Sequence, residues 1–159
     1  MQPNFLLFIT DQQRADHLGS YGNAIVQTPE LDALARQGWS ADRFYVASPI
    51  CMPNRATLMT GRMPSVHGVR HNGIPLSQRA TTFVDRLRGA GYATALIGKA
   101  HLQNMTGKGP VWPPAGSDRS QGEAWTAEPG NYDQEWGPLW RTDPGHDLQT
   151  PFYGFQRVA

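Results

Sequence analysis

The sequence has a single cysteine, no long hydrophobic run and no excess of charge of either sign. One cysteine excludes an internal disulfide framework and favours a reducing compartment. With 14 basic and 13 acidic residues, the chain lacks the clustered positive charge that binding to a phosphate backbone needs. We therefore expect no nucleic-acid partner.

The apolar run at the N-terminus is short. Phe5–Ile9 follows no basic residue and is too brief for the core of a secretory signal peptide. No stretch approaches the roughly 20 apolar residues that a membrane-spanning helix needs. These features predict a soluble, cytoplasmic protein with no membrane partner.

What the chain does have is an alternation of strand-like and helix-like segments over residues 1–106. Apolar stretches at 4–10, 44–47 and 91–99 predict short strands. Strands that alternate with helices indicate an α/β fold with a mostly parallel sheet flanked by helices. Ligands in such sheets bind beyond the carboxyl ends of the strands.

Three helices are predicted from their capping residues. Thr28 can begin the first, and Gly38 can end it in the left-handed conformation. The second begins near Pro53, since proline suits a first helical turn. The third is capped by Thr82, with Asp85 placed for the reciprocal bond of a capping box.

Residues 107–151 show no clean period and are rich in glycine, proline and tryptophan. They are too aromatic for a disordered linker, so we expect an ordered excursion. Its tryptophans are better explained by ordinary packing than by a ligand pocket. These are Trp112, Trp125, Trp136 and Trp140.

The cysteine lies between two prolines, in the stretch PICMPNRATLMTGR at 49–62. Pro53 places Cys51 just ahead of a helix N-terminus, where backbone N–H groups attract anions. Arg55 follows one turn later, and its forked guanidinium suits sulfate or phosphate oxygens. The alternative is that Cys51 is a small buried apolar side chain and Arg55 a surface residue.

Further polar residues follow the predicted strands. Asp11 and Gln12 offer hard oxygen ligands, which suit Ca²⁺, Mg²⁺ or Mn²⁺. Lys99 and His101 alternate with Ala100, so they point the same way if the backbone stays extended. Lysine can hold an anionic oxygen, and histidine can donate a proton to a leaving group.

A glycine-rich loop, HGVRHNG at 67–73, contains Asn72. Its amide could donate to a substrate, although asparagines in loops mostly stabilise turns.

Four blocks in order resemble the type I sulfatases of the alkaline-phosphatase-like superfamily. The block at 51–62 carries the C-x-P-x-R core of that family's signature. NFLLFITDQQRADHLGSYGN at 4–23 resembles its opening strand with the metal-binding acidic pair. TPELDALARQG at 28–38 resembles its first helix, and GYATALIGKAHL at 91–102 its Gly-Lys-x-His segment. The chain is thus identified as the N-terminal portion, 1–159, of a sulfatase-like catalytic domain, the front part of a longer protein.

The resemblance implies a sulfuric ester hydrolase that cleaves a small-molecule sulfate monoester. In the family a formylglycine-generating enzyme oxidises the cysteine to formylglycine (3-oxoalanine), whose hydrate attacks the ester and later expels sulfate. Cys51 would be the nucleophile precursor and, with Asp11 and Gln12, a ligand of a divalent cation, Ca²⁺ first and Mn²⁺ or Mg²⁺ next. Arg55, Lys99 and His101 would be catalytic.

Lys99 and His101 would also contact the sulfate ester, as Asn72 would from its loop. The chain departs from the family pattern at Met52 and Asn54, where smaller residues are usual, and at Gln12, where many relatives have a second aspartate. A neutral Gln12 favours Mn²⁺ or a phosphoryl or phosphonate ester.

Three rival functions stay open. One is a phosphonate monoester or phosphodiester hydrolase on the same fold, and another is a non-catalytic remnant. A third is a hydrolase that uses the bare thiolate of Cys51. In members of the family, a second metal-binding pair lies much later in the sequence. Residues 143–147 of this sequence, DPGHD, have suitable residue types for such a pair but lie in the wrong position.

Overall fold

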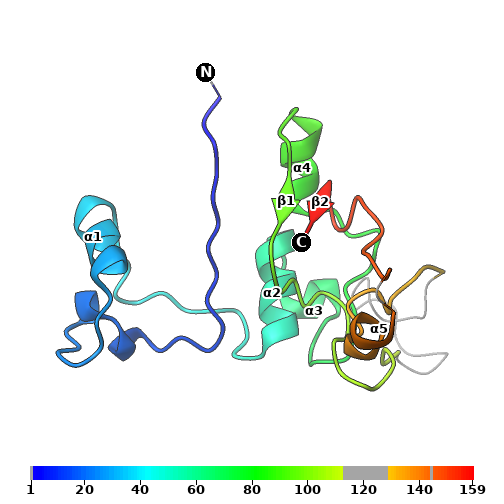
Figure 1. Ribbon diagram of the computed structural model, residues 1–159, viewed down its shortest axis with the longest axis horizontal. Helices are drawn as coiled ribbons and strands as arrows, with labels where there is room; N and C mark the ends of the chain where they lie inside the picture. The colour runs from blue at the N-terminus through cyan, green and yellow to red at the C-terminus, as the bar shows by residue number, and fades with distance from the viewer. Residues whose placement is uncertain (1, 113–128, 144) are drawn as a thin grey trace. The chain divides into compact units, whose positions relative to one another are not determined.

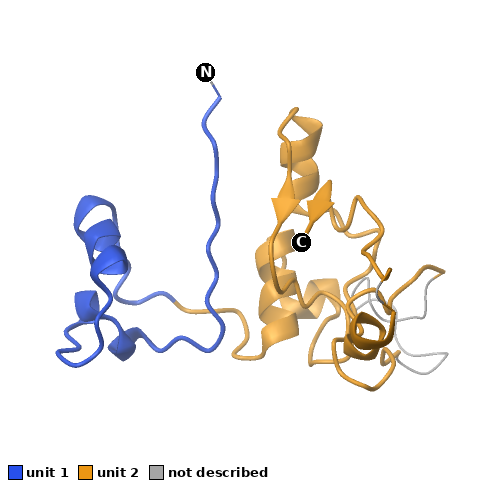
Figure 2. Ribbon diagram, viewed as in Figure 1, with its two compact units in different colours: residues 1–44 blue, residues 45–159 orange. Residues whose placement is uncertain are grey.

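The computed structural model describes residues 2–112, 129–143 and 145–159. The chain forms two compact units, residues 1–44 and 45–159 (Figure 2). None of the helices in these described ranges has the length and apolar character needed to cross a bilayer.

The first unit contains two short 3-10 helices and one α-helix (Figure 1). They are η1 (Ala15–His17), η2 (Gly19–Tyr21) and α1 (Pro29–Gln37). As predicted, Thr28 is the N-cap residue of α1 and proline occupies the first turn. Gly38 ends the helix with φ −114°, so the predicted left-handed conformation at this residue is wrong.

Residues 4–10 form no strand, contrary to the prediction, although all of them are described. Leu6 is 91% exposed and Phe8 is 78% exposed. A strand needs a neighbour in a hydrogen-bonded ladder, and the sheet among the described residues joins residues 95–96 to residues 157–158. The predicted strand at 44–47 is absent for the same reason.

The second unit contains the remaining helices and the sheet. Its elements are α2 (Cys51–Thr60), α3 (Pro64–His67), α4 (Phe83–Gly89), β1 (Ala95–Leu96), α5 (Gly137–Thr142) and β2 (Arg157–Val158). β1 and β2 run parallel and side by side, with Ala95 opposite Arg157 and Leu96 opposite Val158 (Figure 1). The α/β class with a parallel sheet is confirmed, in the form of two short strands among the described residues.

Helix α2 lies at the centre of the apolar core of the second unit. It contacts both α3 and α4, and its Met52 and Ala56 are completely buried. Leu76, Leu102 and Phe152 come from distant parts of the chain to complete this core. Each of the larger buried side chains, such as Met52 and Leu76, contributes about 1.5–3 kcal/mol, so α2 is held firmly along its buried face.

Helix α4 begins as the sequence predicts. Thr82 accepts a hydrogen bond from the Asp85 N–H, and Asp85 accepts one from the Thr82 N–H, which completes the capping box. The Thr82 hydroxyl also donates to the Tyr153 carbonyl at 2.9 Å. The cap therefore ties α4 to the C-terminal segment.

Candidate active site

Cys51 is the first residue of α2, so this helix begins two residues earlier than predicted. The thiol is half-buried and forms no disulfide. Pro53 is compatible with this start because N–H groups in a first helical turn have no partner within the helix. Residue 51 therefore lies at the positive end of a ten-residue helix.

Asn72 lies against the same helix end. Ile50, the N-cap residue, makes no side-chain cap. Instead, Oδ1 of Asn72 accepts a hydrogen bond from the Met52 N–H at 3.1 Å, and the Gly73 N–H donates to the Met52 sulfur at 3.1 Å. The structure thus brings Asn72 next to Cys51, and its predicted contact with a substrate stays a prediction.

Arg55 connects α2 to the segment that follows β1. Its Nη1 donates to the Lys99 carbonyl at 2.8 Å, a contact between residues 44 positions apart. Both side chains are half-buried. The structure therefore joins α2, which carries Cys51 and Arg55, to the backbone of Lys99 within a single unit.

The segment of Lys99 and His101 is not extended, contrary to the assumption behind their predicted alignment. His101 has φ +53°, in the left-handed region, and its residue is only 7% exposed. The alternation rule applies to extended backbone and fails at such a turn. The two residues lie on a bent segment held from both sides.

Glu135 is the residue that holds the other side of this turn. Its Oε1 accepts a hydrogen bond from the His101 N–H at 2.6 Å. Its Oε2 accepts from the N–H groups of Leu102 and Gln103 at 2.7 and 2.8 Å. Burial raises the pKa of the Glu135 carboxyl, and the three N–H donors and the charge of Arg55 oppose that rise.

Sequence reasoning missed Glu135. It lies more than 30 residues beyond the turn, in the stretch without periodicity. A glutamate among tryptophan, glycine and proline gives no local sign of a distant backbone partner. The sequence offered one sign of a structural role, which is the negative charge of Glu135 directly before Trp136.

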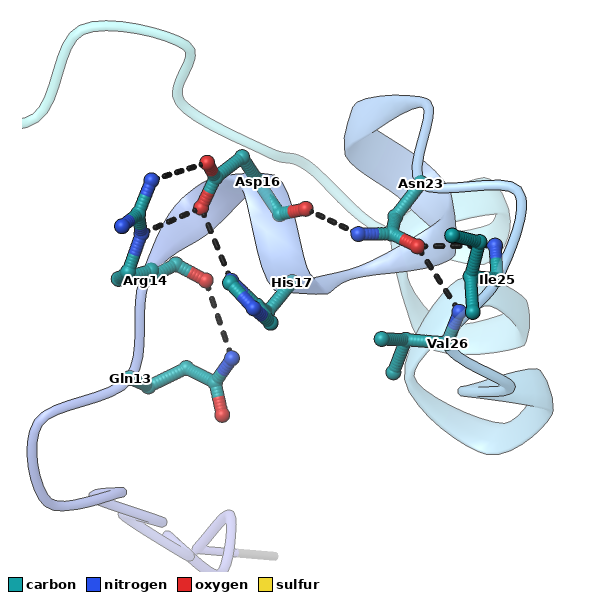
Figure 3. A network of polar contacts seen from close by, with 7 residues as sticks. All are labelled: Gln13, Arg14, Asp16, His17, Asn23, Ile25 and Val26. Atoms are coloured by element: carbon teal, nitrogen blue, oxygen red, sulfur yellow. Dashed lines mark hydrogen bonds and ion pairs between the residues drawn. The ribbon is translucent and has the colours of Figure 1, made fainter.

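Asp11 and Gln12 belong to the first unit, where both are exposed. Gln12 adopts φ +54°, which turns the chain directly after Asp11. Asp16 follows in η1, and hydrogen bonds from Arg14 and then His17 lower the pKa of its carboxyl to about 2 (Figure 3).

Asn23 completes this network. Its Nδ2 donates to the Asp16 carbonyl at 2.5 Å, and its Oδ1 accepts from the N–H groups of Ile25 and Val26 (Figure 3). These polar contacts therefore fix the loop that follows Asp11 and Gln12.

The donor set fits a hard cation in kind. The Asp11 carboxylate and the Gln12 amide oxygen are ligands that Ca²⁺, Mg²⁺ and Mn²⁺ accept. Within the described ranges, no group of three His, Cys, Asp or Glu side chains could hold a metal. Asp11 and Gln12 belong to one unit and Cys51 to the other. That all three bind one cation stays a prediction.

Trp112 and Trp140 pack against other aromatic rings. Trp112 meets Tyr132 edge to face, and Trp140 meets His146 in the same way, both at 4.9 Å between centroids. Packing is thus confirmed for these two, and Trp125 lies outside the described residues. His146 also hydrogen-bonds the Gln134 carbonyl at 2.8 Å, so its contacts are with its own unit.

Comparison with known proteins supports the resemblance found in the motifs. The sulfatase family pattern matches residues 3–147. Steryl-sulfatase of Mus musculus is 42% identical over 113 residues, which cover 63% of this chain and 18% of that protein. Arylsulfatase of Clostridium perfringens is 36% identical over 104 residues, covering 64% of this chain and 21% of that protein.

A solved structure shows the same likeness. The phosphonate monoester hydrolase of Agrobacterium radiobacter superposes with a TM-score of 0.54 and 36% identity, covering 69% of this chain and 20% of that one. The chain spans about a fifth of the length of these relatives. With its match over residues 3–147 and its four ordered motifs, the chain belongs to the sulfatase family.

Proposed function

We propose that the protein hydrolyses a sulfate monoester, with residue 51 as the source of the nucleophile. One observation carries this proposal: the N-terminal half of α2 is bonded to two distant segments, the Asn72 loop through the Met52 N–H and the Lys99 carbonyl through Arg55. Segments that were predicted from separate motifs are thus bonded to one helix, which supports the proposal. The names of the relatives, which are sulfatases, agree with this substrate class.

The charges at this helix end suit a tetrahedral anion. The N-terminus of α2 carries partial positive charge, and Arg55 and Lys99 add two cations. Lys99 binds an anionic oxygen of the ester, while Arg55 holds the Lys99 backbone and offers its remaining guanidinium donors. His101 donates a proton to the leaving oxygen.

Two groups complete this chemistry in the proposal. Formylglycine, made from Cys51 by a formylglycine-generating enzyme, supplies as its hydrate both a nucleophilic hydroxyl and a route for sulfate release. Asp11 and Gln12 hold a divalent cation, Ca²⁺ or otherwise Mn²⁺ or Mg²⁺, that stabilises the charge developing on the ester oxygens. The half-buried setting of Cys51 limits the access of bulk water to residue 51.

A second candidate is hydrolysis of a phosphonate monoester. Two observations favour it: the structural likeness to a phosphonate monoester hydrolase, and the neutral Gln12 beside Asp11. With Gln12 in place of a second aspartate, the cation site carries one negative charge fewer. The class of ester that the site prefers can differ for that reason.

The test compares kcat/KM of the full-length protein for matched aryl sulfate and aryl phosphonate monoesters. We expect the sulfate to be preferred and Cys51→Ala to abolish turnover of both. Leu58→Ala is the matched control, since this side chain is 42% exposed on the same helix, and it should keep wild-type rates. Preference for the phosphonate would replace the first candidate by the second, and full activity of Cys51→Ala would refute both.

A further inference from the structure

The turn at residues 101–103 presents three consecutive backbone N–H groups to one carboxylate. The three donors lie 2.6, 2.7 and 2.8 Å from the Glu135 oxygens. Distances this short are typical of hydrogen bonds to an ionised acceptor. Such a concave array of N–H groups is typical of a turn in which one residue enters the left-handed region, and His101 does so with φ +53°.

This conformation is unfavourable for a histidine, which has a Cβ atom, so the surroundings must impose it. Glu135 supplies the constraint because it accepts from all three N–H groups at once. The carboxylate is itself only 5% exposed, and burying a charge is costly unless hydrogen bonds and opposite charge compensate it. An apolar core residue would fill the same space without that cost, but it would not fix the turn.

The same segment is held at its other end by Arg55, whose Nη1 donates to the Lys99 carbonyl at 2.8 Å. The guanidinium and the Glu135 carboxylate attract each other electrostatically. Lys99 and His101 therefore lie on a short bend that is held at both ends. Arg55 binds the carbonyl at one end, and the Glu135 carboxylate binds the N–H groups at the other. Rotation about the bend would move both side chains relative to Cys51.

Neighbouring residues reinforce the grip on this bend. Gln134 donates its N–H to Oε1 of Gln103 at 3.0 Å, and Nε2 of Gln103 donates to the Asn131 carbonyl at 3.2 Å. Residues 131–135 thus form a clasp across residues 101–103. Glu135 is the charged residue of the clasp whose side chain bonds the turn, because no hydrogen bond among the described residues joins the Asp133 side chain to residues 101–103.

We propose that Glu135 is a positioning residue for catalysis: its buried carboxylate sets the turn that aims Lys99 and His101 at the ester. This inference rests on the proposed function of that pair. Glu135 touches no substrate and acts through the backbone. A misplacement of a catalytic group by about 1 Å can lower the rate about 100-fold. Loss of the turn should therefore lower kcat.

The experiment uses the full-length protein with three substitutions. Glu135→Gln puts an amide NH₂ against backbone donors, and Glu135→Asp keeps the charge on a side chain one methylene shorter. Asp133→Asn is the matched control, because it removes one charge from the same clasp without touching the turn. Rates for an aryl sulfate are expressed per folded molecule, as measured by circular dichroism, and the affinity for inorganic sulfate is measured by calorimetry.

For Glu135→Gln we expect kcat to fall about 10- to 100-fold, and KM to rise as the affinity for sulfate falls, because Lys99 binds the ester. Glu135→Asp should recover part of the rate, and Asp133→Asn all of it. A role in stability alone predicts fewer folded molecules, each with wild-type kcat, and that result would overturn the proposal. If Glu135→Gln does not fold, a wild-type kcat in Glu135→Asp overturns it and a reduced kcat supports it.

Failure of the proposed function gives a different result. If the wild-type protein hydrolyses no ester, the sulfate affinities decide the role of Glu135 by themselves. Weaker sulfate binding in Glu135→Gln than in Asp133→Asn then supports positioning. Equal affinities, or no sulfate binding by the wild type, overturn it.

Discussion

His67 should make the free energy of unfolding depend on pH. Its ring is completely buried, and Nδ1 accepts a hydrogen bond from the Val69 N–H at 3.1 Å. The neutral ring therefore carries its proton on Nε2, which lies 3.0 Å from the Thr57 hydroxyl. A second proton would turn Nδ1 into a donor facing the Val69 donor, and it would place a charge in the core.

Burial, with a smaller contribution from Arg62, lowers the pKa of His67 from 6.5 to about 4. Because the folded-state pKa lies below the unfolded one, this contribution to stability is complete above pH 6.5. It is lost as the pH falls from 6.5 towards 4. One pKa unit corresponds to about 1.4 kcal/mol. The contribution of His67 to the free energy of unfolding is therefore at most about 3 kcal/mol, of which about 2 kcal/mol is lost between pH 7 and pH 5.

The assay is urea unfolding at pH 7, 6 and 5 of the wild type and of His67→Asn. Asparagine can keep the acceptor for the Val69 N–H but has no proton to gain. We expect the variant to be less stable at pH 7 and to lose about 2 kcal/mol less than the wild type on going to pH 5. His71→Asn, at an exposed histidine, is the control and should keep the wild-type slope. Parallel pH curves for wild type and His67→Asn would refute the reasoning.

Three further predictions concern the helix ends and the cation. Asn72→Ala should lower the free energy of unfolding by about 1 kcal/mol, because the Met52 N–H loses its acceptor. Asn72→Asp should keep that acceptor and the wild-type stability. Equal urea midpoints for the wild type and Asn72→Ala would contradict this prediction. Thr82→Ala should lower it by about 1–2 kcal/mol through loss of the α4 cap, while exposed Thr81→Ala should not, as thermal melting would show. Chelation should abolish hydrolysis by the full-length protein, and Asp11→Asn should raise the Ca²⁺ or Mn²⁺ concentration needed to restore it; an unchanged requirement would remove Asp11 from the cation site.

The elements that the sequence predicted correctly depend on local interactions. The α4 cap joins residues three positions apart, and α1 begins at a threonine followed by proline. The strand expected at 4–10 depends on a hydrogen-bonded neighbour, which an apolar pattern does not specify. The apolar pattern was real, but in these residues it marks exposed side chains rather than a buried strand.

The candidate site divides in the same way. Cys51 and Arg55 could be placed together because one helical turn separates them. Lys99 could be named from its motif, but its bond to Arg55 spans 44 residues. The left-handed turn at His101 depends on Glu135, more than 30 residues away, so no local rule predicts it.

The state of residue 51 in protein that turns over a sulfate ester tests the account most directly. Trypsin should release residues 44–55 as one peptide that contains Cys51. Mass spectrometry should find this peptide with an aldehyde in place of the thiol, in a fraction that rises and falls with the specific activity of the preparation. Full activity in preparations that contain only the unmodified thiol would contradict the account.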